Sequence, residues 1–267
     1  MSDTRPVEDL LLLERKGAVA EIVINNPARH NAMSLSMWER LASLLDGLAG
    51  DPSVRVLVMR GAGGKAFAAG ADISRFESER ATAEASGHYN AMSTAASSKL
   101  YNFPRPTIAR INGYCIGGGL ALALCCDLRI AAEDSTFAIP AARLGLGYGL
   151  PGVERLVDLV GPSAAMDIFV TARRLRAEEA LRIGLVNRVV PVDDLEQAVA
   201  DATGRICENA PLTIAAAKAA IRELAKEPHL QDRAAVARMV DACFASDDFK
   251  EGRRAFMEKR APRFQGK

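Results

Sequence analysis

Strand-like apolar runs alternate with helical segments up to about residue 190, and this alternation constrains the fold more than any other feature. Residues 54–59 (VRVLVM) and 107–111 have the continuous apolar character of buried strands. Helices are expected over about 81–100, 118–126 and 163–170, and Ser36 to Glu39 has the pattern of a capping box at the start of an earlier helix. Strands that alternate with helices predict an α/β fold in layers.

The pattern changes after Pro191. Amphipathic helices alone are expected there, over about 193–208, 211–226, 231–245 and 247–259. We therefore predict a core over residues 1–191, built from ββα units, and a C-terminal helical region over residues 192–267. Terminal amphipathic helices of this kind commonly pack on the core or on another subunit.

Composition argues against several kinds of partner. The chain has 34 Lys and Arg against 33 Asp and Glu, so no whole-chain field favours nucleic acid or an anionic membrane. The longest uncharged apolar run, residues 111–126, is too short to span a bilayer. Five cysteines without a CxxC pair, and no signal-peptide pattern, favour a cytoplasmic location. His30, His88 and His229 share no metal-ligand spacing, so no metal site is expected.

Two glycine-bearing segments indicate the chemistry. Residues 66–72 (AFAAGAD) and 112–119 (NGYCIGGG) each have the pattern of a strand end that turns into a helix start. Backbone N–H groups at such a start lack intrahelical partners and point outward. Two of these amides converging on one point would form an oxyanion hole, which stabilises a carbonyl oxygen as it becomes negative. The segments therefore predict acyl chemistry on a polarised carbonyl.

Together with residues 26–32 (NPARHNA) and the tail 251–260 (EGRRAFMEKR), these segments resemble the crotonase superfamily, the enoyl-CoA hydratase/isomerase family. The resemblance runs nearly end to end. It implies a ββα spiral fold, a homotrimer or dimer of trimers, and an acyl-CoA thioester as substrate with no separate cofactor. It also implies that the amides of Ala71 and Gly118 form the oxyanion hole.

The resemblance also implies where coenzyme A binds. The matching positions are Ala28, Arg29, Ala69, Asp72, Ile73, Ser74, Phe256 and Lys259. Ala69 and residues 72–74 would line the path of the adenine and pantetheine groups. Phe256 and Lys259 would reach the nucleotide, often from the neighbouring subunit. The Lys259 ammonium suits a ribose phosphate as a point charge, and a solvated surface lysine is the alternative interpretation.

Two positions depart from the hydratases of this family, which have one glutamate two residues after the triple glycine and another after the proline of a Phe-x-x-Pro segment. This chain has Ala121 and Ala141 there. A positioned acid or base typically contributes about 10²–10⁴-fold, and a methyl group supplies neither function, so ordinary hydration is not expected. Glu133, Asp134 and Arg143 are ionisable residues nearby in sequence, and surface positions are the favoured interpretation for them.

Tyr148 lies in a glycine-rich stretch, residues 144–152 (LGLGYGLPG). It matches a pocket tyrosine of methylmalonyl-CoA-type decarboxylases in the superfamily, although those enzymes carry histidine at the position of Ala71. Packing, with a locally bonded hydroxyl, is the alternative interpretation of Tyr148. For Asp127, a structural hydrogen bond is favoured over catalysis.

Three functions therefore stay open. The first is an acyl-CoA-processing enzyme of the hydratase/isomerase family that acts through the two amides. The second is a malonyl- or methylmalonyl-CoA-type decarboxylase that uses Tyr148. The third is a non-catalytic acyl-CoA-binding protein that lacks both glutamates.

Overall fold

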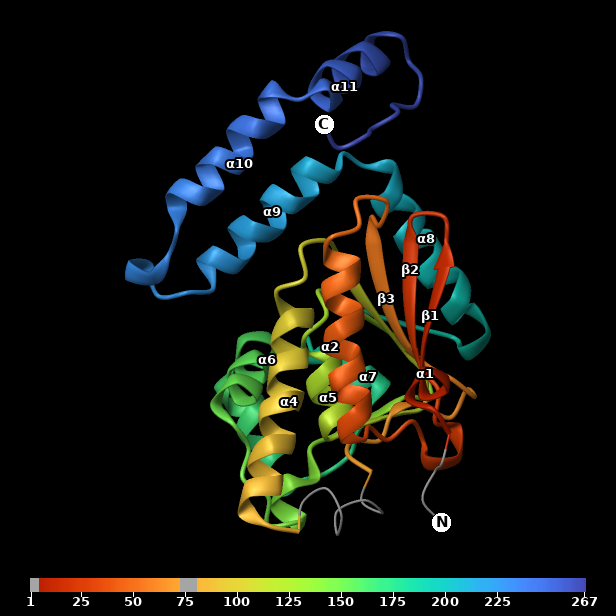
Figure 1. Ribbon diagram of the computed structural model, residues 1–267, viewed down its shortest axis with the longest axis vertical. Helices are drawn as coiled ribbons and strands as arrows, with labels where there is room; N and C mark the ends of the chain where they lie inside the picture. The colour runs from red at the N-terminus through yellow and green to blue at the C-terminus, as the bar shows by residue number, and fades with distance from the viewer. Residues whose placement is uncertain (1–4, 73–80) are drawn as a thin grey trace.

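A computed structural model describes residues 5–72 and 81–267, whose strands form two sheets (Figure 1). The larger sheet has the order β1-β2-β3-β5-β7-β10 and the smaller has the order β4-β6-β8-β9. The first set is β1 (Leu11–Lys16), β2 (Val19–Ile24), β3 (Val56–Gly61), β5 (Thr107–Ile111), β7 (Leu128–Ala132) and β10 (Arg188–Val190). The second set is β4 (Ala66–Ala68), β6 (Tyr114–Ile116), β8 (Thr136–Ala138) and β9 (Leu175–Arg176). Only the β1–β2 and β8–β9 pairs among these strands are antiparallel.

From β3 to β8, consecutive strands alternate between the two sheets. β3, β5 and β7 are neighbours in the larger sheet, while β4, β6 and β8 are neighbours in the smaller one. A helix follows each pair of strands, namely α4 (Ala83–Tyr101), α5 (Gly118–Ala123) and α6 (Leu150–Thr171). Each ββα unit thus adds one parallel strand to each sheet, which confirms the predicted α/β class and its ββα spiral.

The central strands β3, β5 and β7 of the larger sheet are mostly buried, which explains their continuous apolar runs. Side chains alternate along β3, so Leu57 and Met59 join the main core whereas Val56 and Val58 face a second cluster. The main core also holds the apolar face of α2 (Leu35–Ala49). α8 (Leu195–Glu208) covers the second cluster.

Two helix starts differ from the sequence-based expectation. α2 begins at Leu35, and the Ser34 hydroxyl accepts a hydrogen bond from the Met37 N–H at 3.4 Å, so the capping box at Ser36 is wrong. α6 begins at Leu150 rather than near residue 163, and Gly161 interrupts it with a φ of 75°. The glycine and proline residues around position 150 concealed its first half. α1 (Val7–Leu10) and α7 (Ala177–Arg182) complete the helices of the core.

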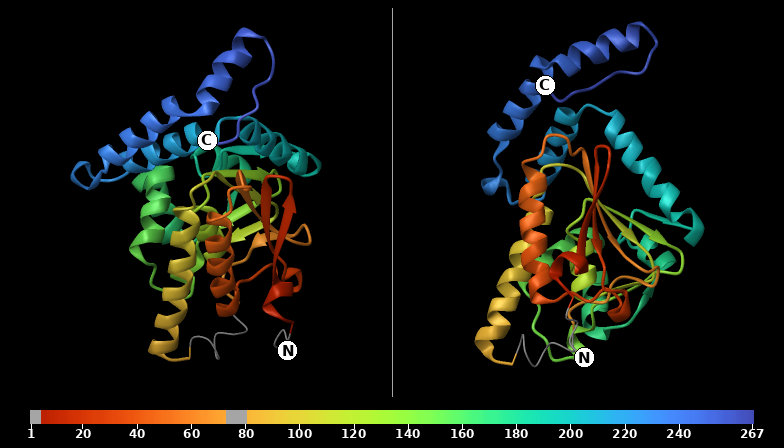
Figure 2. Two further views of the ribbon diagram at one scale, coloured as in Figure 1. Left: turned by 45° about the horizontal axis from the view of Figure 1, so that its top comes forward. Right: turned by 45° about the vertical axis from the view of Figure 1, so that its right-hand side comes forward.

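The last helices extend away from the sheets (Figures 1 and 2). They are α9 (Pro211–Leu224), α10 (Arg233–Ala245) and α11 (Asp247–Met257). The tail returns to the core, where the Arg55 guanidinium donates to the Phe264 carbonyl at 2.5 Å. The boundary at residue 191 stays a prediction, since α8, the first long helix beyond it, packs on the sheet. Within the described ranges, no helix is long and apolar enough to cross a membrane.

Candidate active site

Ala71 and Gly118 lie at the same edge of the smaller sheet. Ala71 follows β4 and Gly118 follows β6, and these strands are parallel neighbours, so their carboxyl ends meet. A Cβ placed on Gly118 would lie 3.9 Å from the Ala71 nitrogen. Neither amide donates to an acceptor within residues 5–72 and 81–267. Two amides without partners therefore lie next to each other, as an oxyanion hole requires.

Backbone pairing with Met33 sets the direction of the Ala71 amide. The Met33 N–H donates to the Gly70 carbonyl at 2.8 Å, and the Asp72 N–H donates to the Met33 carbonyl at 3.1 Å. Successive amides of an extended segment point in opposite directions, so the Ala71 N–H faces away from Met33. It is thereby available to a ligand.

Buried side chains hold this backbone in place. The Tyr89 hydroxyl of α4 donates to the Met33 carbonyl at 3.0 Å and accepts from Trp38 Nε1 of α2 at 2.9 Å. Asn31 is fully buried, and its Nδ2 donates to the Ala66 carbonyl at 2.7 Å, which fixes the start of β4. Sequence analysis missed these supporting residues, because polar groups far apart in the sequence carry no local periodic signal.

Two glycines allow α5 to approach β4. Gly70 has a φ of +96°, and a Cβ there would lie 3.2 Å from the Ile116 carbonyl oxygen and 3.4 Å from the Gly118 nitrogen. A Cβ on Gly119 would lie 2.1 Å from the Ala68 carbonyl oxygen. A side chain at either position would crowd the two segments that carry the amides.

Two alanines border this edge, Ala121 and Ala141, at the positions where the resemblance implies glutamates in hydratases. Ala141 follows β8, the parallel neighbour of β6, and is 8% exposed. Ala121 lies on the first turn of α5, where its N–H donates to the Gly117 carbonyl at 2.9 Å. Neither side chain can transfer a proton. The amide site therefore has no acid or base at these two positions.

The ionisable residues nearby in sequence lie at the surface. Glu133 and Asp134 are exposed. They precede β8 whereas Ala141 follows it, so they lie at the opposite edge of the smaller sheet from Ala141. The three residues of β8 span about 10 Å. Arg143 is exposed at the end of the short helix η3 (Pro140–Arg143). The surface interpretation of all three is confirmed.

The predicted coenzyme A positions that precede residue 75 differ in burial and in hydrogen bonding. Asp72 is buried and its carboxylate accepts two hydrogen bonds from Arg29 Nη1, at 2.9 and 3.1 Å. Arg29 belongs to the short helix η1 (Pro27–Arg29), in which Ala28 is exposed. The Ala69 N–H donates to the His30 carbonyl at 2.9 Å. Ile73 and Ser74 lie outside the described residues.

Phe256 and Lys259 are not brought to the amides of their own chain. Phe256 lies on α11 and is 83% exposed, and Lys259 follows that helix. In both figures α11 lies beyond α9 and α10, far from α5. These two residues could therefore meet the amide site only in another copy of the chain.

Tyr148 is packed inward. Its ring makes an edge contact with Phe169 of α6 at 5.1 Å between centroids. Its hydroxyl is buried and has no hydrogen-bond partner in the described part of the chain, unlike the locally bonded hydroxyl of the packing interpretation. Burial raises the pKa of Tyr148, with a further increase from Cys125 and opposition from Arg155. Tyr148 therefore holds a neutral, unused hydrogen-bond donor. The Cys125 thiol donates to the Ala121 carbonyl at 3.2 Å.

Asp127 has the structural role that was expected. Its Oδ2 accepts hydrogen bonds from the Thr107 N–H at 2.8 Å and from Lys218 Nζ at 2.6 Å. Its Oδ1 accepts from Arg222 Nη2 at 2.8 Å. Asp127 thus joins β5 to α9. In the described ranges, no cluster of three His, Cys, Asp or Glu side chains could hold a metal ion.

Comparison with known proteins links this chain to one enzyme family. Residues 14–267 match the sequence model described as enoyl-CoA hydratase/isomerase. A crotonyl-CoA hydratase from Syntrophomonas wolfei is 35% identical over 257 residues, which cover 96% of this chain and 98% of that protein. A carnitinyl-CoA dehydratase from Salmonella typhi is 35% identical over 270 residues, covering 98% of this chain and 100% of that protein.

Solved structures have the same fold. An enoyl-CoA hydratase/carnithine racemase from Magnetospirillum magneticum superposes with a TM-score of 0.91 at 38% identity, covering 97% of this chain and 96% of that one. An enoyl-CoA hydratase from Bacillus anthracis superposes with a TM-score of 0.88 at 32% identity, covering 97% and 100%. The similarity therefore includes both the spiral core and the terminal helices.

Proposed function

Because the chain belongs to the enoyl-CoA hydratase/isomerase family, we propose that it binds an acyl-CoA thioester and stabilises the carbonyl oxyanion with the amides of Ala71 and Gly118. The observation that carries this proposal is the adjacency of two backbone N–H groups without acceptors. As the thioester becomes an enolate or tetrahedral adduct, negative charge gathers on one oxygen. Each preorganised donor at that oxygen typically contributes about 3–4 kcal/mol to the transition state.

Ordinary hydration is not the main reaction in this proposal. Hydration needs one group that activates water and one that delivers a proton to Cα. Ala121 and Ala141 can do neither, and Glu133 and Asp134 lie at the other edge of the sheet. Each positioned acid or base is worth about 10²–10⁴-fold, so the rate without both is low. The relatives are named as a crotonyl-CoA hydratase and a carnitinyl-CoA dehydratase, and these names support an acyl-CoA substrate. They do not show that this chain hydrates that substrate.

Decarboxylation of a malonyl- or methylmalonyl-type thioester is the second candidate. The bond between Cα and the carboxylate breaks, carbon dioxide leaves, and the electron pair becomes an enolate on the thioester oxygen. This step requires the two amides but no glutamate. The specific observation in its favour is the buried Tyr148 hydroxyl without a partner, which could orient the leaving carboxylate.

A screen by mass spectrometry tests these reactions. The chain is incubated with enoyl-, malonyl-, methylmalonyl- and aryl-CoA esters, and products are identified by the mass of water gained or of carbon dioxide lost. Loss of carbon dioxide that decreases in Tyr148→Phe supports decarboxylation. Binding of thioesters without any mass change favours a non-catalytic binding protein. The proposal fails if no thioester is bound or converted.

We also propose that the active unit is a homotrimer or a dimer of trimers. The terminal helices expose large apolar side chains that a contact between copies would bury. These include Ile221, Leu224, Phe244, Phe256 and Met257. In such an assembly Phe256 and Lys259 of one copy would reach the nucleotide bound by the next. Light scattering coupled to gel filtration tests this, and a monomer at micromolar concentration would contradict it.

A further inference from the structure

The chain reverses direction at Lys259, just beyond α11. Lys259 has a φ of 52°, in the left-handed region. Its N–H donates to the Phe256 carbonyl at 3.2 Å, and the Arg260 N–H donates to the Ala255 carbonyl at 3.0 Å. This is the Schellman pattern at a helix end, where glycine is the usual residue. A lysine at this position is strained, and such a residue persists only where its surroundings fix the backbone.

Glu251 of α11 fixes this turn. Its side chain is 12% exposed, and its carboxylate accepts hydrogen bonds from Arg260 Nη1 at 2.6 Å and Nη2 at 3.0 Å. Two parallel bonds of this kind hold a guanidinium in one orientation. The same carboxylate accepts from the Arg263 N–H at 3.0 Å. Because Arg260 directly follows Lys259, the ion pair also fixes the backbone of Lys259.

A second carboxylate holds the tail farther along. Asp248 lies on the same face of α11 as Glu251, one helical turn earlier, and is 4% exposed. It accepts hydrogen bonds from the N–H groups of Gln265 at 2.6 Å and Gly266 at 2.8 Å. The tail therefore runs back along α11, and Lys259 is the corner between the two segments.

The Lys259 ammonium remains available to a ligand. Two carboxylates next to the turn, Glu251 and Glu258, bind Arg260 instead, with Arg260 Nε 2.6 Å from Glu258 Oε2. Lys259 is exposed and forms no ion pair with any residue that the structure describes. A cation with a fixed backbone and no neutralising partner suits an anion that another molecule supplies.

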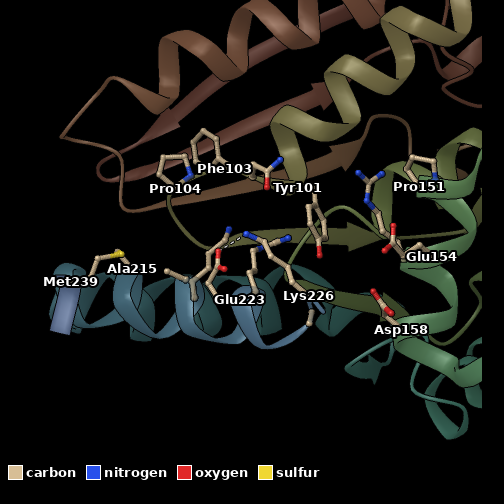
Figure 3. A pocket seen from close by; sticks show the side chains of 16 residues that line it. Tyr101, Phe103, Pro104, Pro151, Glu154, Asp158, Ala215, Glu223, Lys226 and Met239 are labelled. Carbon is tan, nitrogen blue, oxygen red and sulfur yellow. Dashed lines mark hydrogen bonds and ion pairs between the residues drawn. The ribbon is translucent and has the colours of Figure 1, made fainter. Parts of the chain in front are cut away.

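The helices that carry this corner are fixed at their base. Tyr101, the last residue of α4, extends toward α9 beside a pocket of about 430 Å³ (Figure 3). The guanidinium carbon of Arg222 on α9 lies 3.7 Å from the centroid of the Tyr101 ring, and its Nη2 binds Asp127 at 2.8 Å. Farther out, Phe244 of α10 makes an edge contact with Phe249 of α11 at 5.3 Å between centroids. The corner therefore has a defined position relative to the core.

We propose that Glu251 and Arg260 are positioning residues, which fix the Lys259 turn so that its ammonium binds the ribose phosphate of coenzyme A held by the neighbouring copy. This inference rests on the proposed binding of an acyl-CoA thioester. A phosphate ester carries about −1.5 to −2 charge at pH 7, and an ammonium suits it as a point charge. Because the turn is already fixed, binding requires less ordering than a flexible terminus would.

Calorimetric titration of the full-length, assembled protein with coenzyme A and with dephospho-coenzyme A, which lacks the ribose phosphate, tests the proposal. The wild type should bind coenzyme A about tenfold more tightly than the dephospho form. Lys259→Ala should lose this preference. Glu251→Gln should lose most of it although Lys259 is intact, and both variants should bind dephospho-coenzyme A like the wild type. The double variant should lose no more than Lys259→Ala alone.

Two variants on α11 are matched controls. Asp247 and Lys250 pair with each other at 2.8 Å, away from Arg260, so Asp247→Asn and Lys250→Ala should keep the wild-type preference. Arg260→Lys keeps the charge but not the two parallel bonds, and it should lose the preference as Glu251→Gln does. It provides the same test if light scattering shows that Glu251→Gln does not assemble.

Lys259→Gly tests the strain separately. It should unfold at a higher temperature than Lys259→Ala, because glycine adopts the left-handed conformation without steric cost. Both variants lack the ammonium, so their ligand preference should be the same. Equal unfolding temperatures would contradict the strained turn.

The remaining outcomes overturn the proposal at different points. If Glu251→Gln and Arg260→Lys weaken both ligands equally, or keep the preference that Lys259→Ala loses, the ion pair has only a structural role. If the wild type binds both ligands equally, the phosphate contact is wrong and the thioester proposal stands. If the wild type binds neither ligand, the thioester proposal itself fails, and this inference fails with it.

Discussion

Gly118→Pro is the sharpest perturbation of the proposed oxyanion hole, because it deletes one N–H donor and no side chain. Gly118 is the first residue of α5, a position where proline is tolerated because its N–H has no intrahelical partner. The preceding Gly117 has a ψ of −120°, away from the helical region that a following proline disfavours. A Cβ at Gly118 meets nothing closer than 3.7 Å. The free energy of unfolding should therefore change by no more than about 1 kcal/mol.

The catalytic effect should be much larger than the effect on stability. Removal of one oxyanion donor typically costs about 3–4 kcal/mol in the transition state, or 10²–10³-fold in kcat. Gly118→Ala is the matched control, since it keeps the N–H and adds a methyl group at van der Waals distance from Gly70 and Ala71. Gly118→Ala should keep most of the activity that Gly118→Pro loses.

Infrared spectroscopy of a bound thioester with a ¹³C-labelled carbonyl measures this effect without knowledge of the reaction. Two amide donors should shift the carbonyl stretch to lower frequency in the wild type and in Gly118→Ala. In Gly118→Pro a large part of the shift should disappear. An unchanged carbonyl frequency, together with unchanged kcat/KM on whichever thioester the screen identifies, would refute the oxyanion hypothesis.

Three further predictions follow from particular side chains. Joint replacement of Ala121 and Ala141 by Glu should raise crotonyl-CoA hydration at least about 10²-fold, measured as loss of enoyl-thioester absorbance; a wild type that is equally fast would contradict this. Gly119→Ala, with its Cβ 2.1 Å from a backbone oxygen, should lower the free energy of unfolding in urea by about 1–3 kcal/mol or more. Gly87→Ala, on the exposed face of α4 with nothing within 4 Å, should raise the free energy of unfolding by about 0.5–1 kcal/mol. Equal effects of Gly119→Ala and Gly87→Ala would be inconsistent with the packing argument. Because the pKa of Tyr148 is raised by folding, the folded state retains a proton that the unfolded state loses near pH 10, so stability should fall as pH rises above 10. Tyr148→Phe should show a smaller fall in urea unfolding, and identical pH profiles would count against the buried phenol.

Much of the fold could be predicted because its signals are local. The apolar run 54–59 identified a strand buried on both faces, and helical periodicity located α8 to α11 within a few residues. The start of α6 was missed since Gly149, Pro151 and Gly152 resemble a loop, although proline is favourable in the first turn of a helix. The short strands β4, β6 and β8 have only three residues each, too few for a periodic signal.

The candidate site likewise has features that the sequence determined and features that only the tertiary structure decided. By itself the sequence determined which residues carry amides near glycines, that Ala121 and Ala141 lack ionisable groups, and which family the chain resembles. Only the tertiary structure decided that Ala71 and Gly118 lie side by side, because their distance depends on the parallel pairing of β4 with β6. It also decided that the Asp72 carboxylate pairs with Arg29. Local sequence patterns report the conformation of neighbouring residues, whereas contact between distant segments is set by strand pairing, close backbone approach and burial.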